Sequence, residues 1–145
     1  MFFQKNRSGF SRHPLFAVML LALACGGCGS GEKEPEMAAV TGIVKLDGTP
    51  VKGLLVKFEP KAAGGDLKIG SASSGITDDQ GKFTLTSASG KSGAVVGNHT
   101  VRINHASEAD APADQQIKAE YNTDSTTTKM VEKGKTNEFT FELTK

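Results

Sequence analysis

The sequence predicts an all-β domain, an antiparallel β-sandwich of about seven short strands, behind an N-terminal export signal and a flexible tether. After residue 38, apolar residues alternate with polar ones over several segments, which is typical of half-buried strands. Clusters of Gly, Asp and Pro separate these segments and indicate turns. Outside the signal no segment has a convincing helical period, and only residues 108–116 weakly favour a helix.

The alternation assigns one face of each predicted strand to a core. Strands are predicted at residues 40–46, 54–59, 99–103 and 138–143, and weaker ones at 69–77, 83–85, 117–121 and 126–132. The expected inward side chains include Val40, Val44, Leu46, Leu54, Val56, Phe58, Phe83, Leu85, His99, Val101, Ile103, Phe139, Phe141 and Leu143. Both cysteines precede the first strand, so no disulfide can hold this domain and its core depends on packing.

Two turns are specified by residue type. Residues 47–50 read Asp-Gly-Thr-Pro, and residues 77–82 read Thr-Asp-Asp-Gln-Gly-Lys. Asp and Gly tolerate backbone angles that other residues avoid, so both segments are expected to connect neighbouring strands.

The first 24 residues have the organisation of an export signal. Lys5, Arg7 and Arg12 precede an apolar run, Leu15–Ala24, and no acidic residue accompanies them. The run has 10 residues, whereas a transmembrane helix needs about 20, so we interpret it as the apolar part of a cleaved signal. We therefore expect a signal peptide at 1–24, a flexible linker at 25–37 and one domain at 38–145.

Cys25 directly follows Ala24 at the end of this run. The arrangement resembles the lipobox of bacterial lipoproteins, where the cysteine is lipidated and becomes the new N-terminus. Cys28, preceded by Gly27, is the alternative site, and a cleaved signal with a free thiol is a third interpretation. Cys25 and Cys28 also have the spacing of a redox pair, but no βαβ pattern accompanies them.

The resemblance implies two or three acyl chains on this cysteine, which hold a protein to a membrane stably where a single chain does not. Gly26 after the cysteine, where Asp would signal retention, fits delivery to an outer membrane. Removing the three basic residues of the signal takes the formal net charge from +1 to −2. A near-neutral domain without a basic face gives no case for nucleic-acid binding.

Four segments of the domain resemble carboxypeptidase-regulatory-like domains, which have a transthyretin-like (prealbumin-like) fold. Val40–Gly53 (VTGIVKLDGTPVKG) is similar to the opening of these domains, and Thr77–Leu85 (TDDQGKFTL) is similar to their second hallmark hairpin. Gly93–Ile103 (GAVVGNHTVRI) resembles a family strand in which an aromatic residue usually occupies the place of His99. Ile117–Asn122 (IKAEYN) resembles a further family segment but lacks its proline.

The resemblance covers roughly residues 38–144 and implies a seven-stranded sandwich with Greek-key order. It implies a non-catalytic domain that supports an attached enzyme or contacts carbohydrate or protein. No attached enzyme is present in this sequence, so the solitary lipoprotein members are the nearest match.

Other candidate sites are weakly supported. His99 and His105 are too few to hold zinc, which takes three or four ligands. Asp47, Asp78 and Asp79 are explained as turn residues, since calcium needs six to eight oxygens. No catalytic loop or elbow motif is present. The chain lacks the C-terminal Tyr-Arg-Gly-Ser of transthyretin-like hydrolases and the two tyrosines of intradiol dioxygenases. We therefore expect no catalytic residue, no metal and no cofactor.

The leading hypothesis is a cell-envelope lipoprotein, anchored to a membrane through Cys25, that presents a binding or structural domain. An envelope protein or a polysaccharide is the expected partner. The alternative is an extracytoplasmic carbohydrate-binding module, although the chain has no Trp and one Tyr. A transthyretin-like enzyme with a degenerate site is the least favoured. An exposed aromatic row would support the second hypothesis, and a cleft where His99, His105 and carboxylates converge would support the third.

Overall fold

The computed structural model describes residues 34–62, 70–107, 109 and 111–145, which belong to one compact unit. The described residues form an all-β domain, as predicted. Its strands are β1 Met37–Ala38, β2 Val40–Leu46, β3 Thr49–Pro50, β4 Leu54–Pro60, β5 Ser73–Ile76, β6 Lys82–Thr84, β7 Thr86–Ser87, β8 Ala94–Val95, β9 Gly97–His105, β10 Thr128–Val131 and β11 Asn137–Leu143.

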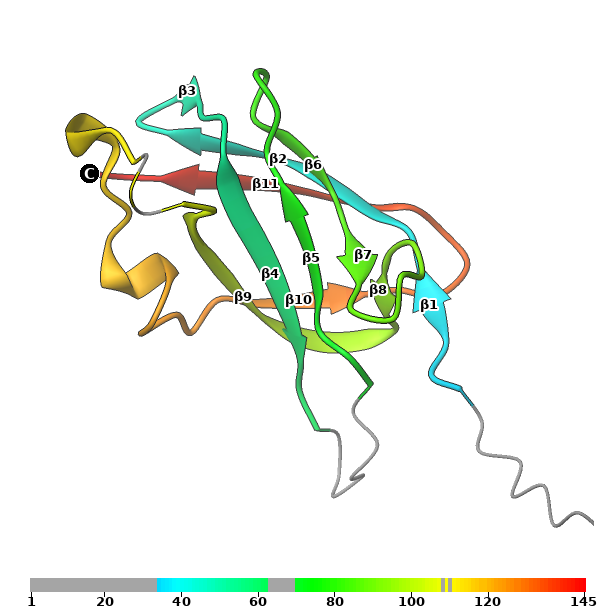
Figure 1. Ribbon diagram of the computed structural model, residues 1–145. Coiled ribbons are helices and arrows are strands. Elements are labelled where there is room, and N and C mark those ends of the chain that lie inside the picture. Colours follow the sequence, from blue (N-terminus) through cyan, green and yellow to red (C-terminus); the bar gives the residue numbers. More distant parts are fainter. Residues whose placement is uncertain (1–33, 63–69, 108, 110) are drawn as a thin grey trace, which may run out of the picture. The chain divides into compact units, whose positions relative to one another are not determined.

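The strands form two main sheets and one small ribbon. The larger sheet has the order β10-β9-β4-β5-β7, and the second has the order β11-β2-β3, with β6 also paired to β2. β1 and β8 form a separate pair. In Figure 1, β4 and β5 run across β2 and β11, so the core lies between the two main sheets.

One pair departs from the antiparallel arrangement that we expected. β11 runs parallel to β2, with Asn137 opposite Val40 and Leu143 opposite Leu46, whereas all other paired strands are antiparallel. The reason is the path of the chain. β10 ends beside Gly97, a short turn follows, and β11 starts at the same end of the sandwich as β2.

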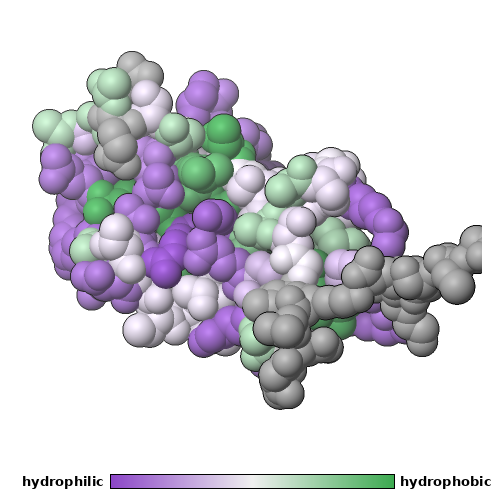
Figure 2. Space-filling model, turned by 60° about the horizontal axis from the view of Figure 1, so that its bottom comes forward, coloured by the Kyte–Doolittle hydropathy of each residue, from purple (hydrophilic) through white to green (hydrophobic). Residues whose placement is uncertain are grey.

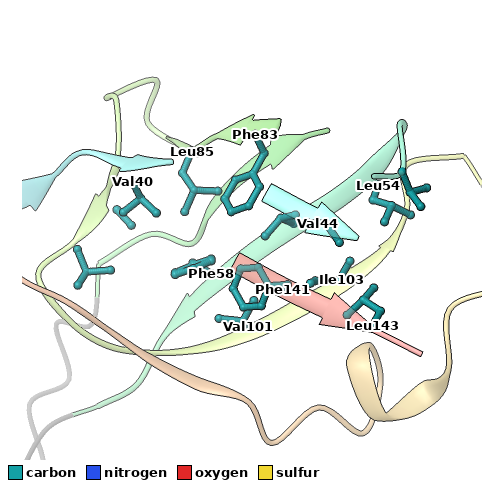
Figure 3. Close-up of a cluster of buried hydrophobic side chains, with 14 of the residues drawn as sticks. Val40, Val44, Leu54, Phe58, Phe83, Leu85, Val101, Ile103, Phe141 and Leu143 are labelled. Carbon is teal, nitrogen blue, oxygen red and sulfur yellow. The ribbon is translucent and has the colours of Figure 1, made fainter. Parts of the chain in front are cut away.

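The core includes most of the side chains that the alternation assigned to it. It also holds Val51, Ala94 and Val131, which the alternation did not assign, whereas Phe139 is half-buried. Val40, Leu54, Val56, Phe58 and Leu85 are completely buried. Figure 3 shows side chains from β2, β4, β9 and β11 pointing toward one another between the sheets. Phe58 lies among the aromatic rings, with its centroid 5.6 Å from Phe139 and 6.3 Å from Phe141. The period-two pattern therefore identified the buried face correctly.

The predicted turns are also present. Asp47 and Gly48 both have positive φ, 49° and 80°, the conformation that a two-residue connection between antiparallel strands requires. In the second turn Gly81 has φ 70°, and a Cβ there would lie 2.5 Å from the carbonyl oxygen of Val44. Only glycine fits both the angle and the space.

The segment after β9 differs from its prediction. Residues 117–121 were expected to form a strand, but Ala119–Tyr121 is a 3₁₀ helix, η3. Residues 108–116 were expected to favour a helix, and their described part includes Ala113–Gln115, a single 3₁₀ turn, η2. The weak strand predicted at 69–77 is confirmed only as β5, since residues 63–69 lie outside the described residues.

Residues 113–127, which we name the cover segment, close one side of the sandwich without pairing as a strand. The Tyr121 hydroxyl and the Thr144 hydroxyl lie 3.1 Å apart, just beyond the end of β11. The Ser125 hydroxyl donates to the carbonyl oxygen of Val101 on β9 at 2.6 Å. Ile117 and Tyr121 pack against the core. Polar contacts to β9 and to the end of β11 thus hold the segment, and they replace the hydrogen bonds that a paired strand would make.

Candidate functional site

The predicted lipid site lies outside the described residues. Cys25, its alternative Cys28 and the signal peptide all precede Glu34, the first residue that the structure describes. Among the described residues, no helix is long and apolar enough to cross a bilayer.

The chain enters the domain at one end of the sandwich, which we call the proximal end. Glu34 is paired with Lys91, and Glu36 with Lys133 at 2.9 Å. The Glu36 carbonyl accepts a hydrogen bond from the Val96 amide at 2.8 Å, and β1 pairs with β8. The Lys91 ammonium holds the pKa of Glu34 below its usual range. Residues 34–37, which we had assigned to the linker, therefore lie against the domain.

His99 is a core residue and is not placed as a metal ligand. Its ring is completely buried, 5.6 Å from that of Phe58, and its Nε2 lies 2.7 Å from the carbonyl oxygen of Val95. Its Nδ1 has no hydrogen-bond partner among the described residues. Burial lowers the pKa of His99, and the Val95 carbonyl opposes this with a smaller effect. The ring thus occupies the place of the aromatic residue that the resemblance assigned to this position.

His105 is the last residue of β9. It lies at the end of the sandwich opposite the proximal end, which we call the distal end, near the 47–53 and 77–81 loops. Its Nε2 lies 2.7 Å from the carbonyl oxygen of Gln115, which fixes the start of the cover segment. The ring lines an open hollow of about 550 Å³ together with Lys52, Asp79 and Gln115. Six residues of strand separate His105 from His99, a distance of about 20 Å. The two histidines therefore do not converge on one cleft.

The acidic turn residues serve the turns. Asp78 Oδ1 accepts hydrogen bonds from the amides of Gln80 and Lys82 at 2.8 and 2.9 Å, and these bonds hold the pKa of Asp78 below its usual range. Asp79 pairs with Lys52 at 2.7 Å. Asp47 Oδ1 accepts from the Lys145 amide at 3.3 Å. Within the described part of the chain, no group of three or more His, Cys, Asp and Glu side chains is placed to hold a metal ion.

Two residues gain importance that the sequence did not assign to them. Asn137, expected only to flank the last strand, is buried and donates to the carbonyl oxygens of Ala39, Glu132 and Lys135. Lys129 is the Cα partner of His99 in the ladder, so it lies on the core-facing side of β10. Residues two apart in a strand share a face, so assigning Val131 to the inward face of the predicted strand 126–132 would have placed Lys129 there too.

The aromatic side chains that the structure describes do not form an exposed row. Phe58, Phe83 and Phe141 are buried, and Phe139 and Tyr121 are half-buried. The exposed large hydrophobic residues among those described are Ile76 and Met130. Figure 2 shows one face of the domain, where hydrophobic patches lie between hydrophilic side chains. The observation that would have favoured a carbohydrate-binding module is therefore missing from the described residues.

Comparisons with protein-family models, with curated proteins and with solved structures found no match to this chain. The resemblance to carboxypeptidase-regulatory-like domains and the assignment of Cys25 as a lipid site therefore stay predictions. What the structure establishes is an all-β domain whose core-facing residues follow the sequence pattern.

Proposed function

We propose that this chain is a cell-envelope lipoprotein, anchored to a membrane through a lipid on Cys25. Its domain is a non-catalytic β-sandwich of the seven-stranded, Greek-key, transthyretin-like kind, serving as a binding or structural module. The observation that carries the proposal is the sequence at the signal boundary, where a basic start and a 10-residue apolar run end at Ala24-Cys25. Gly26 favours delivery to an outer membrane.

The described fold supports a short distance between anchor and domain. Glu34, the first described residue, already contacts the domain, so at most nine backbone steps separate Cys25 from it. Fully extended, they span at most about 32 Å. The proximal end would therefore lie close to the bilayer, and the distal end, with His105 and the Asp47 turn, would face away from it.

The core arrangement supports a binding or structural role over a catalytic one. His99 is enclosed between the sheets, and His105 contacts the cover segment at the other end of β9. A partner protein or a polysaccharide of the envelope is the class of ligand that this location offers.

Membrane fractionation of cysteine variants tests the anchor. Cys25→Ser should move the protein from the membrane fraction to the soluble fraction, or leave it as an unprocessed precursor. Cys28→Ser, three residues away, is the matched control and should stay with the membrane. Release by Cys28→Ser alone would assign the lipid to Cys28. Membrane retention of a double variant whose signal has been cleaved, checked by intact mass, would exclude a lipid anchor at either residue.

A further inference from the structure

The outer edge of β11 is an unpaired strand edge of the described domain. β11 lies at the end of its sheet and pairs only with β2. The Asn137 amide donates to the Ala39 carbonyl at 2.8 Å, and the Leu143 carbonyl accepts from the Asp47 amide at 2.9 Å. These bonds fix the odd-numbered residues as those that face β2. The backbone groups of Glu138, Thr140 and Glu142 therefore point away from the sheet.

This free edge has defined ends. Beyond Leu143, the Thr144 amide donates to the Tyr121 hydroxyl at 3.2 Å, so the cover segment occupies the distal end. At the proximal end, Asn137 bonds to the turn that precedes β11. Between these limits lie residues 138–142, about 16 Å of strand. An unpaired strand of this length is a template for one added strand.

Charges on the two sides of the edge differ in sign. On the solvent side, Glu138 is exposed and has no ion pair with any residue that the structure describes, and Glu142 pairs with Lys45 at 3.0 Å. On the core side, the Lys129 ammonium lies 5.9 Å from the Phe139 ring centroid and 5.7 Å from that of Phe141. Lys129 likewise has no ion pair or hydrogen bond within the described residues.

The opposite charges determine which way an added strand must face. Side chains of a strand alternate between the two faces, and a shift by one residue exchanges them. Basic side chains on the solvent face would lie beside Glu138, whereas on the core face they would meet Lys129. An open groove of about 560 Å³, lined by Thr41, Thr84 and Glu138 among others, adjoins the solvent face and leaves room for long side chains. Lys82 also lines it, but from β6, on the other side of β2.

We propose that the β11 edge, residues 138–142, binds an extended segment of a partner polypeptide that carries basic residues at every second position. The segment adds to the sheet through backbone hydrogen bonds, with its basic side chains toward Glu138 and its small apolar side chains toward Phe139. A second copy of this chain is a poor occupant. Antiparallel pairing of two β11 strands about Thr140 would place Glu138 opposite Glu142, and like charges directly opposite destabilise a pair.

This surface would give the proposed binding module its ligand. Only the location of the partner, in the cell envelope, rests on the proposed function. Binding of a soluble peptide does not need the lipid. Failure of the peptide test would therefore leave the anchor untouched, and failure of the anchor would leave this surface untouched.

Amide hydrogen exchange of the full chain in detergent tests the proposal. The probe is a blocked nine-residue peptide of alternating Lys and Val, and its counterpart carries Glu in place of Lys. Without peptide, the amides of Glu138, Thr140 and Glu142 should exchange fast while those of Phe139 and Phe141 are protected. A saturating amount of the Lys-Val peptide should slow the three fast amides at least about tenfold, the effect of one hydrogen bond per amide.

Substitutions at two residues, Thr140 and Glu138, test whether the protection arises at the β11 edge. Thr140→Pro removes an outward amide, which an edge strand tolerates, and should abolish binding, whereas Thr140→Ala keeps the amide and should bind normally. Glu138→Lys should weaken the Lys-Val peptide about fivefold and improve the Glu-Val peptide. The Glu138 result stands even if Thr140→Pro does not fold.

Three results would overturn the proposal. The first is protection of all five amides before any peptide is added, which would show that the edge is already covered. The second is equal binding of the Lys-Val and Glu-Val peptides. The third is protection that depends on protein concentration alone, which would assign the edge to a second copy of the chain.

Discussion

Two regions beside β9 are held by different forces. The strands β4 and β9 meet over seven residue pairs, and their inward side chains, including Phe58 and Val101, are buried between the sheets. The cover segment also packs Ile117 and Tyr121 against the core, but it reaches the other side of β9 through polar contacts. Arg102 donates to the backbone carbonyls of Asn122 and Thr123, and Ser125 donates to that of Val101.

The difference shows that a sandwich can close one side without a strand. The Ser125 hydroxyl satisfies a carbonyl oxygen of β9, and the Arg102 side chain satisfies two carbonyl oxygens of the cover segment, where no strand pairing does so. Burial of apolar area stabilises the whole fold, whereas a few polar contacts stabilise a local segment. Substitutions in the two regions should therefore differ in the size and in the reach of their effects.

The largest effect is expected in the core. Phe58→Ala removes a completely buried ring that contacts His99, Phe139 and Phe141. It should lower the free energy of unfolding by about 3–5 kcal/mol in urea denaturation. Met130→Ala, at an exposed position on β10, is the control and should change it by less than about 0.5 kcal/mol. A loss below 1 kcal/mol for Phe58→Ala would contradict the assignment of Phe58 to the centre of the core.

A smaller and more local effect is expected in the cover segment. Arg102→Met removes the donor to Asn122 and Thr123, and should cost about 1–2 kcal/mol of unfolding free energy. Hydrogen exchange should rise mainly at residues 119–127. Arg102 also pairs with Glu59 at 2.9 Å, and Lys57 pairs with the same carboxylate at 2.7 Å. Lys57→Met is therefore the matched control, because it removes an ion pair to Glu59 but no hydrogen bond to the cover segment. Equal exchange in the two variants would show that Arg102 does not hold the segment.

The smallest effect is a dependence of stability on pH. Burial lowers the pKa of His99 in the folded state below the ordinary value of 6.5. As the pH falls below 6.5, the unfolded chain binds the proton first, so stability is full above 6.5 and declines toward the lower folded pKa. His99→Phe, which replaces the ring with an uncharged one, should remove this slope between pH 6.5 and 5. Identical pH profiles for the two proteins would refute the assignment.

Glu59 acts in a lower pH range than His99. The pKa of Glu59 is lowered by its hydrogen bonds from Lys57 and Arg102. The stability it contributes is present above its ordinary value of 4.5 and is lost as the pH falls through the lower folded pKa. The slope assigned to His99 can therefore be measured before Glu59 titrates.

The parts of the fold that local pattern encodes could be predicted from the sequence. Alternation placed Val56 and Ile103 in the core, and Asp47-Gly48 specified its turn. The alternation of Ile117, Ala119 and Tyr121 also indicated a strand, wrongly. Ile117 and Tyr121 pack against the core, but Ala119 is exposed and Ala119–Tyr121 is a 3₁₀ turn. Local pattern cannot distinguish the two, since the partners lie far away in the sequence.

Non-local pairing explains the other differences. The parallel pairing of β11 with β2 depends on the path through β10, which no turn motif encodes. The role of Lys129 appears only when β10 and β11 are placed beside each other. The candidate lipid site is the reverse case: it was recognised from a local motif alone, and Cys25 lies outside the described residues.

The most direct test of the account is the intact mass and the N-terminal peptide of the protein isolated from membranes. We predict a chain that starts at Cys25 and carries the added mass of two or three acyl chains on that residue. An unmodified chain with a free thiol at Cys25, or a modified chain that starts at Cys28, would contradict the central claim.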